Sequence, residues 1–305
     1  MKSSFVIATV AALAAGSAFA QGTTEIYGRI NLTVESQKLN GQTDKGMFDN
    51  SSRIGIRGTE DLGGGLKAGY VIEHGFNADT GAAAGAMWGR ESTVSLGGSF
   101  GTVRLGNMPA SEAYFATADY VSMHNHDTGS SADALYGFVA IAGTLNSAIA
   151  YTSPTVNGLR FDLQYGMKEN TKPDAPLSMA VNYDAGAMHL GLGYEEYDGQ
   201  KSTALRGLWE MGAFTVGGYY ERGSGTVSYN NFRIAGMYTM GASEFHLNLG
   251  KRSGSNGAAD GDQFTVAYNY NLSKRTRLHV FYTSLDLQNG LVDFSSYGVG
   301  LRHNF

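Results

Sequence analysis

The sequence contains no cysteine, and only 4 of its 305 residues are proline. Without cysteine, an exported chain cannot rely on a disulfide framework, so its stability must come from other contacts. The low proline content, beside 43 glycines and 33 tyrosines and phenylalanines, differs from that of a disordered chain. The net charge of −5 is weak and negative. Such a balance argues against a protein that binds nucleic acid.

Long apolar runs are also missing after residue 20, since no stretch approaches the about 18 residues that a membrane-spanning helix needs. The first twenty residues hold a short apolar run, Phe5–Ala15, which follows Lys2 and precedes Ala18-Phe19-Ala20. This order is typical of a cleaved secretory signal peptide. A membrane anchor is the alternative, but the run is too short and no stop-transfer charges follow. We expect residues 1–20 to be the signal peptide and residues 21–305 to form one domain.

The end of the chain shows a strict two-residue alternation. Apolar or aromatic side chains occupy every second position, namely Tyr297, Val299, Leu301, His303 and Phe305. Because successive side chains of a strand point to opposite faces, this segment is predicted to be a strand with one apolar and one polar face. A soluble protein seldom ends in such an unpaired edge, whereas a closed barrel in lipid uses it to pair the last strand with the first.

The same alternation recurs along the whole chain and predicts sixteen strands. They are Glu25–Val34, Ser52–Thr59, Leu66–Phe76, Trp88–Leu96, Thr102–Leu105, Asn146–Thr152, Leu159–Gly166, Ser178–Tyr183, Met188–Tyr194, Thr203–Met211, Ala213–Glu221, Asn230–Met240, Ser243–Lys251, Gln263–Asn271, Arg277–Leu285 and Ser296–Phe305. Short turns alternate with longer polar loops, and the longest gap runs from Gly106 to Leu145. An even strand count with this pattern predicts an all-β transmembrane antiparallel barrel. A soluble β-sandwich is the alternative, but its strands would bury their apolar faces in a shared core.

Five segments, spread along the chain in order, resemble the general porins of β-proteobacteria. They are Ser52-Arg-Ile-Gly-Ile-Arg-Gly-Thr-Glu-Asp-Leu-Gly-Gly-Gly-Leu-Lys-Ala-Gly69, Gly98-Ser-Phe-Gly-Thr-Val-Arg-Leu-Gly106, Asn146-Ser-Ala-Ile-Ala-Tyr-Thr-Ser-Pro154, Leu272-Ser-Lys-Arg-Thr276 and Val299-Gly-Leu-Arg-His-Asn-Phe305. The resemblance implies a 16-stranded outer-membrane barrel, a homotrimer, and a third loop folded into the lumen. It also implies passive diffusion of ions and small hydrophilic solutes, with no enzymatic activity and no cofactor.

Charged lumen residues are expected to set the selectivity of such a channel. The polar faces of the early strands and the long loop supply the predicted constriction residues Arg53, Arg57, Lys67, Arg90, Arg104, Glu112, Asp119 and Asp127, with Asp133 further along the loop. Arginines opposite an acidic loop would create a transverse field and hold the loop in place. The alternative interpretation is that the arginines merely pair with Glu73, Glu60 or water on the inner wall.

Two features depart from the expected arrangement. Arg90 matches a basic position of anion-preferring relatives, but alternation places it on the lipid face with Val94 and Leu96. A bulge, or a position above the bilayer, would resolve the conflict. Ala150 stands where relatives often carry an inward basic residue, which weakens the case for strong anion preference. The sequence therefore predicts weak charge selectivity and leaves its sign open.

Other interpretations of single motifs remain open. His124-Asn-His126 with Asp127 could bind a metal, although this pattern alone is a weak signal. His303 with Ser296 and Ser284 could form the Ser/His pair of a barrel lipase. A ladder of inward aromatic residues would favour a substrate-specific channel for a sugar, carboxylate or phosphate, and the sequence shows no such ladder, although Tyr219 and Phe281 lie on polar faces. Most tyrosines, including Tyr238 and Tyr268, are expected in an aromatic girdle.

The resemblance also predicts the partners. Tyr297 and Phe305 would form the signal by which the terminal strand meets the barrel-assembly machinery, and the neighbourhood of Arg29 and the terminal strands would form the trimer contacts. Outer-membrane lipid and lipopolysaccharide would surround the barrel. An adhesin or a barrel enzyme is a further alternative, but the outer loops are short for either.

Overall fold

The computed structural model describes residues 22–109, 111–118, 121, 123–137, 145–169, 173–225, 227–255, 259–288 and 291–305. The predicted signal peptide lies outside these residues. Strands make up nearly all of the regular structure: β1 (Thr23–Leu39), β2 (Gln42–Asp49), β3 (Arg53–Gly63), β4 (Leu66–Asn77), β5 (Ala82–Ala83), β6 (Glu91–Gly98), β7 (Gly101–Met108), β8 (Leu145–Thr152), β9 (Leu159–Gly166), β10 (Leu177–Ala185), β11 (Met188–Tyr197), β12 (Gln200–Met211), β13 (Phe214–Ser224), β14 (Ser228–Met240), β15 (Ser243–Ser255), β16 (Gly261–Asn271), β17 (Thr276–Leu287) and β18 (Val292–Asn304).

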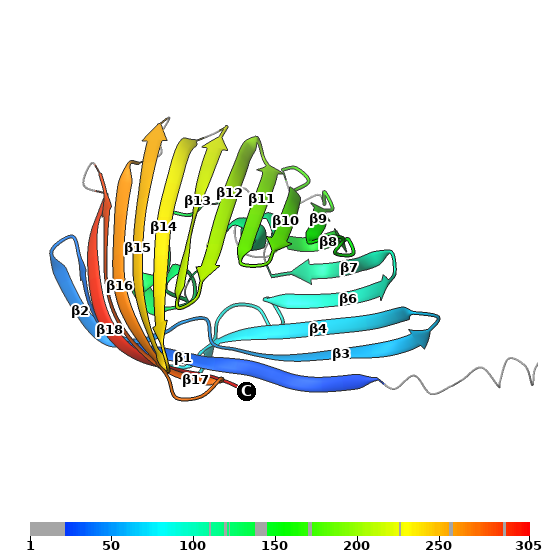
Figure 1. Ribbon diagram of the computed structural model, residues 1–305, viewed down its shortest axis with the longest axis horizontal. Helices are drawn as coiled ribbons and strands as arrows, with labels where there is room; N and C mark the ends of the chain where they lie inside the picture. Colours follow the sequence, from blue (N-terminus) through cyan, green and yellow to red (C-terminus); the bar gives the residue numbers. More distant parts are fainter. Residues whose placement is uncertain are drawn as a thin grey trace, which may run out of the picture.

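Sixteen of these strands form a closed antiparallel barrel, as the alternation predicts. Each strand pairs with its neighbours in chain order, and β18 pairs with β1 from Arg29↔Asn304 to Leu39↔Phe294. Backbone hydrogen bonds of 3.0 Å in both directions between Gly28 and Phe305 extend this seam. A Cβ at Gly28 would come 2.6 Å from the Phe305 ring, so the terminal aromatic residue requires a glycine beside it. Figure 1 shows the strands following one another along a curved wall.

Two short strands lie outside the sixteen and were not predicted. β5 makes only two residue pairs with β4, whereas β2 forms an eight-residue hairpin with the second half of β1. The first half of β1, Thr23–Arg29, pairs instead with β3. β1 therefore exchanges one partner for another along its length, and the hairpin extends the wall beyond the end of β3.

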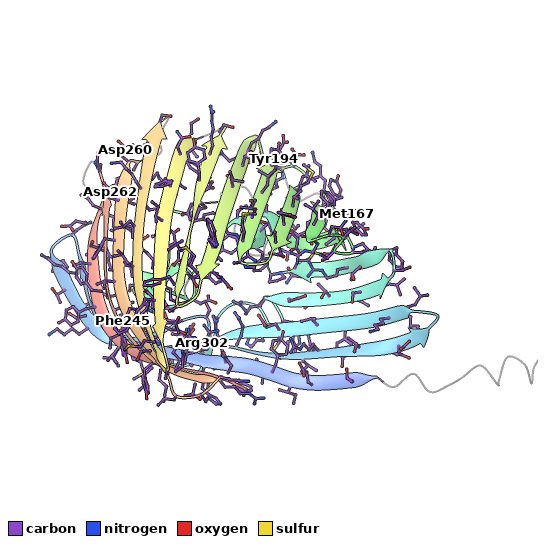
Figure 2. The ribbon with its side chains drawn as sticks, in the orientation of Figure 1. Met167, Tyr194, Phe245, Asp260, Asp262 and Arg302 are labelled. Carbon is purple, nitrogen blue, oxygen red and sulfur yellow. The ribbon has the colours of Figure 1, made fainter. Side chains whose placement is uncertain are left out.

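Burial in the barrel is inverted relative to a soluble protein. Along β15, the outward Phe245, Leu247 and Leu249 are exposed, whereas His246 and Asn248 between them are buried against the interior. Figure 2 shows the outward Phe245 near one end of the wall and Asp262 near the other. Apolar side chains can remain in contact with the surroundings because a lipid bilayer, rather than water, covers the outer face.

A row of aromatic rings crosses the outer face near the short turns. Phe214, Tyr238, Phe245 and Tyr268 lie on four adjacent strands in one register, with ring centroids 4.7, 6.3 and 5.2 Å apart in that order. Such a row fits the headgroup level of a membrane. In the described part of the chain, no helix is long and apolar enough to cross a membrane.

Candidate functional site

The segment between β7 and β8, residues 109–144, is here called the inner loop. Its described part contains the helix α2 (Glu112–Thr117) and two 3-10 turns, η1 (Met123–Asn125) and η2 (Gly129–Ser131). Figure 1 shows this part of the chain on the concave side of the wall, and its hydrogen bonds run to lumen-facing side chains. The inner loop therefore narrows the channel from within, as expected of the third loop.

The helix α2 is held at both ends of its first turn. Ser111 caps it by accepting a hydrogen bond of 2.9 Å from the Tyr114 amide, and Gln164 accepts one of 2.9 Å from the Glu112 amide. The Glu112 carboxylate pairs with Arg104 on β7. Lumen-facing Gly193 leaves room for the helix, since a Cβ there would come 2.8 Å from the Ala113 carbonyl oxygen. Close packing of the helix thus depends on glycine in the facing strand.

Further along, the inner loop meets β1 through Asp127. The carboxylate of Asp127 lies 2.8 Å from Nη1 of Arg29, and the side-chain amide of Asn31 donates a hydrogen bond of 2.7 Å to the Asp127 carbonyl. Arg29 is fully buried, so this ion pair is shielded from water. Ser130 then donates to the Glu35 carboxylate. These contacts fix the middle of the inner loop to the first strand.

The third attachment is to β14 and β16. The Asp133 carboxylate lies 2.8 Å from Nε of Arg233, whose side chain is completely buried. Gln263 makes hydrogen bonds of 2.9 Å with the Ala134 amide and the Ala132 carbonyl. The inner loop is therefore held by three carboxylates, Glu112, Asp127 and Asp133, each in contact with an arginine of the wall.

The early strands and the segment before β6 carry three partly exposed arginines. Glu73 of β4 lies between two of them, 3.6 Å from Nε of Arg53 and 2.6 Å from Nε of Arg90. Arg104 completes the set on β7, where it pairs with Glu112 and lies 4.0 Å from Glu91. We call Arg53, Arg90 and Arg104 the arginine wall. The arginine wall meets the inner loop where Arg104 pairs with Glu112.

Exposure differs between the two signs of charge in this region. The side chains of Arg53, Arg90 and Arg104 are 25, 33 and 24% exposed, whereas those of Glu73, Glu91 and Glu112 are 10, 14 and 12% exposed. The guanidinium groups are therefore the more exposed partners of these ion pairs.

Comparison with known proteins agrees with this geometry. The family model described as Gram-negative porin matches residues 8–290. The chain belongs to the Gram-negative porin family. It is 32% identical to outer membrane porin protein 32 of Delftia acidovorans over 92% of this chain and 88% of that protein. It is 26% identical to the major outer membrane protein P.IB of Neisseria lactamica over the full length of both. The solved anion-selective porin from Comamonas acidovorans superimposes with a TM-score of 0.79 and 24% identity, covering 93% of this chain and all of that one.

The chain is thus an outer-membrane porin, a passive channel and not an enzyme.

The start of β6 explains how Arg90 comes to face Glu73. The strand expected to begin at Trp88 begins at Glu91, so Arg90 precedes it and does not obey its alternation. Trp88 adopts a positive φ of 57°, and the chain turns Arg90 toward Glu73. No bulge within β6 is involved.

The other predicted constriction residues lie elsewhere in the porin. Arg57 pairs with Glu25 of β1 and lies 4.8 Å from the Tyr27 ring centroid, and its side chain is 56% exposed. Lys67 is exposed next to the tight turn that joins β3 to β4. Neither has a recorded contact with the described part of the inner loop. Asp119 lies outside the described residues.

Burial and a neighbouring arginine shift the pKa values of two inner-loop carboxylates, Glu112 and Asp127. Burial raises the pKa of Glu112 above its ordinary value despite the charge of Arg104. Burial acts the same way on Asp127, but the hydrogen bond and charge of Arg29 outweigh it and lower the pKa of Asp127. Asp127 is consequently ionised at neutral pH and remains a firm anchor for the inner loop.

Alternation along the last two strands also marks lumen arginines that the sequence analysis did not single out. Arg277 and Arg302 face the lumen on β17 and β18, directly opposite each other. Arg233, the anchor of Asp133, was missed in the same way. Alternation along their own strands would have found all three.

The metal and lipase interpretations are not supported by the geometry. The described residues contain no group of three or more histidine, aspartate and glutamate side chains that could hold a metal. His303 lies 2.9 Å from the Thr276 hydroxyl, whereas Ser296 faces the lumen and donates to Glu35. Ser296 and His303 therefore cannot form the Ser/His pair of the lipase alternative, because the two side chains point to opposite faces of β18.

Proposed function

We propose that this porin passes small hydrophilic anions more readily than cations, through the passage between the arginine wall and the inner loop. The observation that carries the proposal is the difference in exposure between the two signs of charge at this passage. The side chains of Arg53, Arg90 and Arg104 are more exposed than those of the carboxylates with which they pair. In a narrow, water-filled pore, charged side chains at the lining set ion selectivity.

The proposed preference is modest in size. Each arginine of the arginine wall has a carboxylate partner, so the net charge of the lining is small. Ala150, directly opposite Arg104 in the pairing of β7 with β8, adds no further cation. The related Comamonas acidovorans protein is described as anion-selective, which agrees in sign. We expect a chloride permeability above that of potassium, within the same order of magnitude.

A substrate-specific channel is the second candidate function, and the inward aromatic residues speak against it. Tyr219 and Phe281 do face inward, but both are buried beneath the inner loop. Tyr219 donates to Asp133, and the Phe281 ring lies 6.2 Å from the ring of His124. They therefore support the inner loop and cannot form an aromatic ladder for a solute.

The experiment is to replace Arg53 and Arg90 by glutamine and measure the reversal potential of each variant in a potassium chloride gradient. Each replacement removes an exposed positive group, so the permeability ratio should shift toward potassium. Arg222→Gln on β13 is the matched control, because the side chain of Arg222 is exposed and faces away from the lumen. An unchanged ratio in both wall variants would remove them from the passage.

The proposal includes a homotrimer in the outer membrane, next to lipopolysaccharide, assembled through the terminal strand. Tyr297 and Val299 of β18 and Val34 of β1 are among the more exposed apolar residues of the outer face, at 61, 52 and 54%. They flank the seam that Phe305 closes, which supports a role for this region in assembly and subunit contact. Cross-linking of the purified protein, with Tyr297→Ser as the variant, tests this part.

A further inference from the structure

Four cationic side chains surround a small cavity at the short-turn end of the channel. Lys274 and Arg275 belong to the turn between β16 and β17, and Arg277 and Arg302 belong to the strands that follow. The cavity has a volume of about 70 Å³ and is also lined by Asn271 and Asn304. A water molecule occupies ~30 Å³ in the liquid, so the space is large enough for a small oxyanion. Figure 2 shows Arg302 beside β1 at this end of the wall.

The register places two of these cations face to face. Arg277 of β17 is directly opposite Arg302 of β18. Both face the lumen, since Leu278 and Leu301 beside them are exposed on the outer face. Like charges directly opposite each other destabilise a strand pair. This pair therefore needs a counter-charge between or beside the guanidinium groups.

The described residues supply little counter-charge. Glu244 lies 3.5 Å from Arg277, but it also accepts hydrogen bonds from Asn269 and Asn271. The recorded partner of Arg302 is the Asn304 side-chain oxygen at 3.3 Å, and no described carboxylate lies within ion-pair distance of it. Among the described residues, Glu244 is thus the one carboxylate within ion-pair distance of any of the four cations, and the hydrogen bond of Arg302 is made by its Nε.

We propose that this cavity binds a small oxyanion, with inorganic phosphate as the best-fitting chemistry. The guanidinium groups of Arg275, Arg277 and Arg302 offer planar donor pairs that match phosphate oxygens, and the Lys274 ammonium group adds a point charge. Short turns of outer-membrane barrels face the periplasm, so the site lies at the inner mouth of the porin. Its lining residues differ from those of the arginine wall, which could favour chloride without holding any oxyanion here.

The test measures chloride current through single channels in a phosphatidylcholine bilayer while inorganic phosphate is added on the short-turn side. A bound phosphate should lower the current in a saturable manner. Arg302→Gln should raise the half-effective phosphate concentration at least about tenfold, because it removes a charge-assisted donor pair. Arg302→Lys keeps the charge but not the planar donor pair, so it should give an intermediate value.

Lys251→Gln is the matched control, because this substitution removes the same charge from the protein. Lys251 lies on the outer face of β15, far from the short turn at which β15 begins. It should leave the half-effective concentration unchanged. Heat-dependent migration on gels confirms that each variant is folded. An unsaturable phosphate effect, or equal half-effective concentrations in wild type and Arg302→Gln, would overturn the proposal. Either result leaves the reversal potential, and therefore the proposed anion preference, untouched.

A second arm distinguishes a diffusing phosphate from a lipid headgroup. The recording is repeated in a bilayer that contains phosphatidylglycerol. If a diffusing oxyanion occupies the site, the half-effective phosphate concentration should be the same in both bilayers. Any general effect of the lipid should appear equally in the wild type and in Lys251→Gln. If the anionic lipid abolishes the phosphate effect only when Arg302 is present, a headgroup occupies the cavity and the assignment to a diffusing oxyanion is wrong.

Discussion

Replacement of Asp133 by asparagine should release the inner loop from β14. Asp133 has three kinds of partner in the structure. Its carboxylate lies 2.8 Å from Nε of Arg233, it accepts a hydrogen bond from Tyr219, and it accepts one of 2.8 Å from the Leu135 amide. Asparagine keeps the shape and most of these hydrogen bonds. The change therefore isolates the charge of the ion pair.

The magnitude follows from burial. The side chains of Arg233 and Asp133 are 0 and 5% exposed, so Arg233 cannot turn to water when its partner is neutralised. Removing one partner of a buried ion pair costs about 3–5 kcal/mol, because the other charge stays buried without compensation. At about 1.4 kcal/mol per factor of ten, the detached state of the inner loop should become at least about a hundredfold more populated.

Single-channel recording detects detachment, because a mobile inner loop in the lumen interrupts the current. Asp133→Asn should show more frequent interruptions and closure at a lower applied voltage than the wild type. A double variant with Arg233→Met removes the uncompensated charge as well and should recover part of the loss.

Asp262→Asn is the matched control. Asp262 lies 3.6 Å from Lys251, but the two side chains are 54 and 67% exposed, and such pairs contribute only about 0–1 kcal/mol. Its recordings should equal those of the wild type. If Asp133→Asn also equals the wild type while both proteins are folded, the buried ion pair does not hold the inner loop, and the reasoning is wrong.

Three further predictions concern the same region. Gly191→Ala should weaken the packing of α2 against β11 by about 1–3 kcal/mol, because a Cβ there collides with a helix carbonyl. Gly236→Ala has open space around it and should have no such effect. The frequency of current interruptions is the measurement for both variants. Glu73→Gln should increase the chloride preference in reversal-potential measurements, because it frees two lumen arginines from their counter-charge. The ion pair with Arg29 stabilises only the ionised form of Asp127, whose pKa is lowered. Acidification below a pH of about 3.8 should therefore destabilise the inner loop. The frequency of current interruptions should rise at these pH values in the wild type, and less so in Asp127→Asn.

Alternation predicted the barrel because every second side chain of each wall strand faces lipid and is apolar. Alternation alone did not predict β2, which another sequence signal could have revealed. Residues 39–42 contain Asn40-Gly41, and both central residues adopt positive φ, 48° and 86°. Asn-Gly is the preferred pair for a two-residue hairpin. The alternation of Gln42–Asp49 is poor, so only the turn could have revealed this strand.

The candidate site was predictable by residue type but not by pairing. The sequence placed arginines on the inner wall and carboxylates in the inner loop, and the structure pairs Arg104 with Glu112. It could not assign Asp127 to Arg29 or Asp133 to Arg233, since these contacts join residues about a hundred positions apart. Such pairs depend on the path of an irregular loop, for which no periodicity exists.

Arg90 shows a third limit. Its predicted orientation depended on where β6 begins, and an error of three residues changed the face on which it was placed. Boundaries are the least secure part of any assignment from sequence. A side chain next to a strand end therefore cannot be placed on one face by alternation alone.

The reversal potential of the wild-type porin, recorded across a planar bilayer with unequal potassium chloride concentrations, tests the central claim most directly. Guanidinium groups that are more exposed than their carboxylate partners predict a potential of the sign that marks chloride as the more permeant ion. A potential of the opposite sign would show that the arginine wall does not govern what passes.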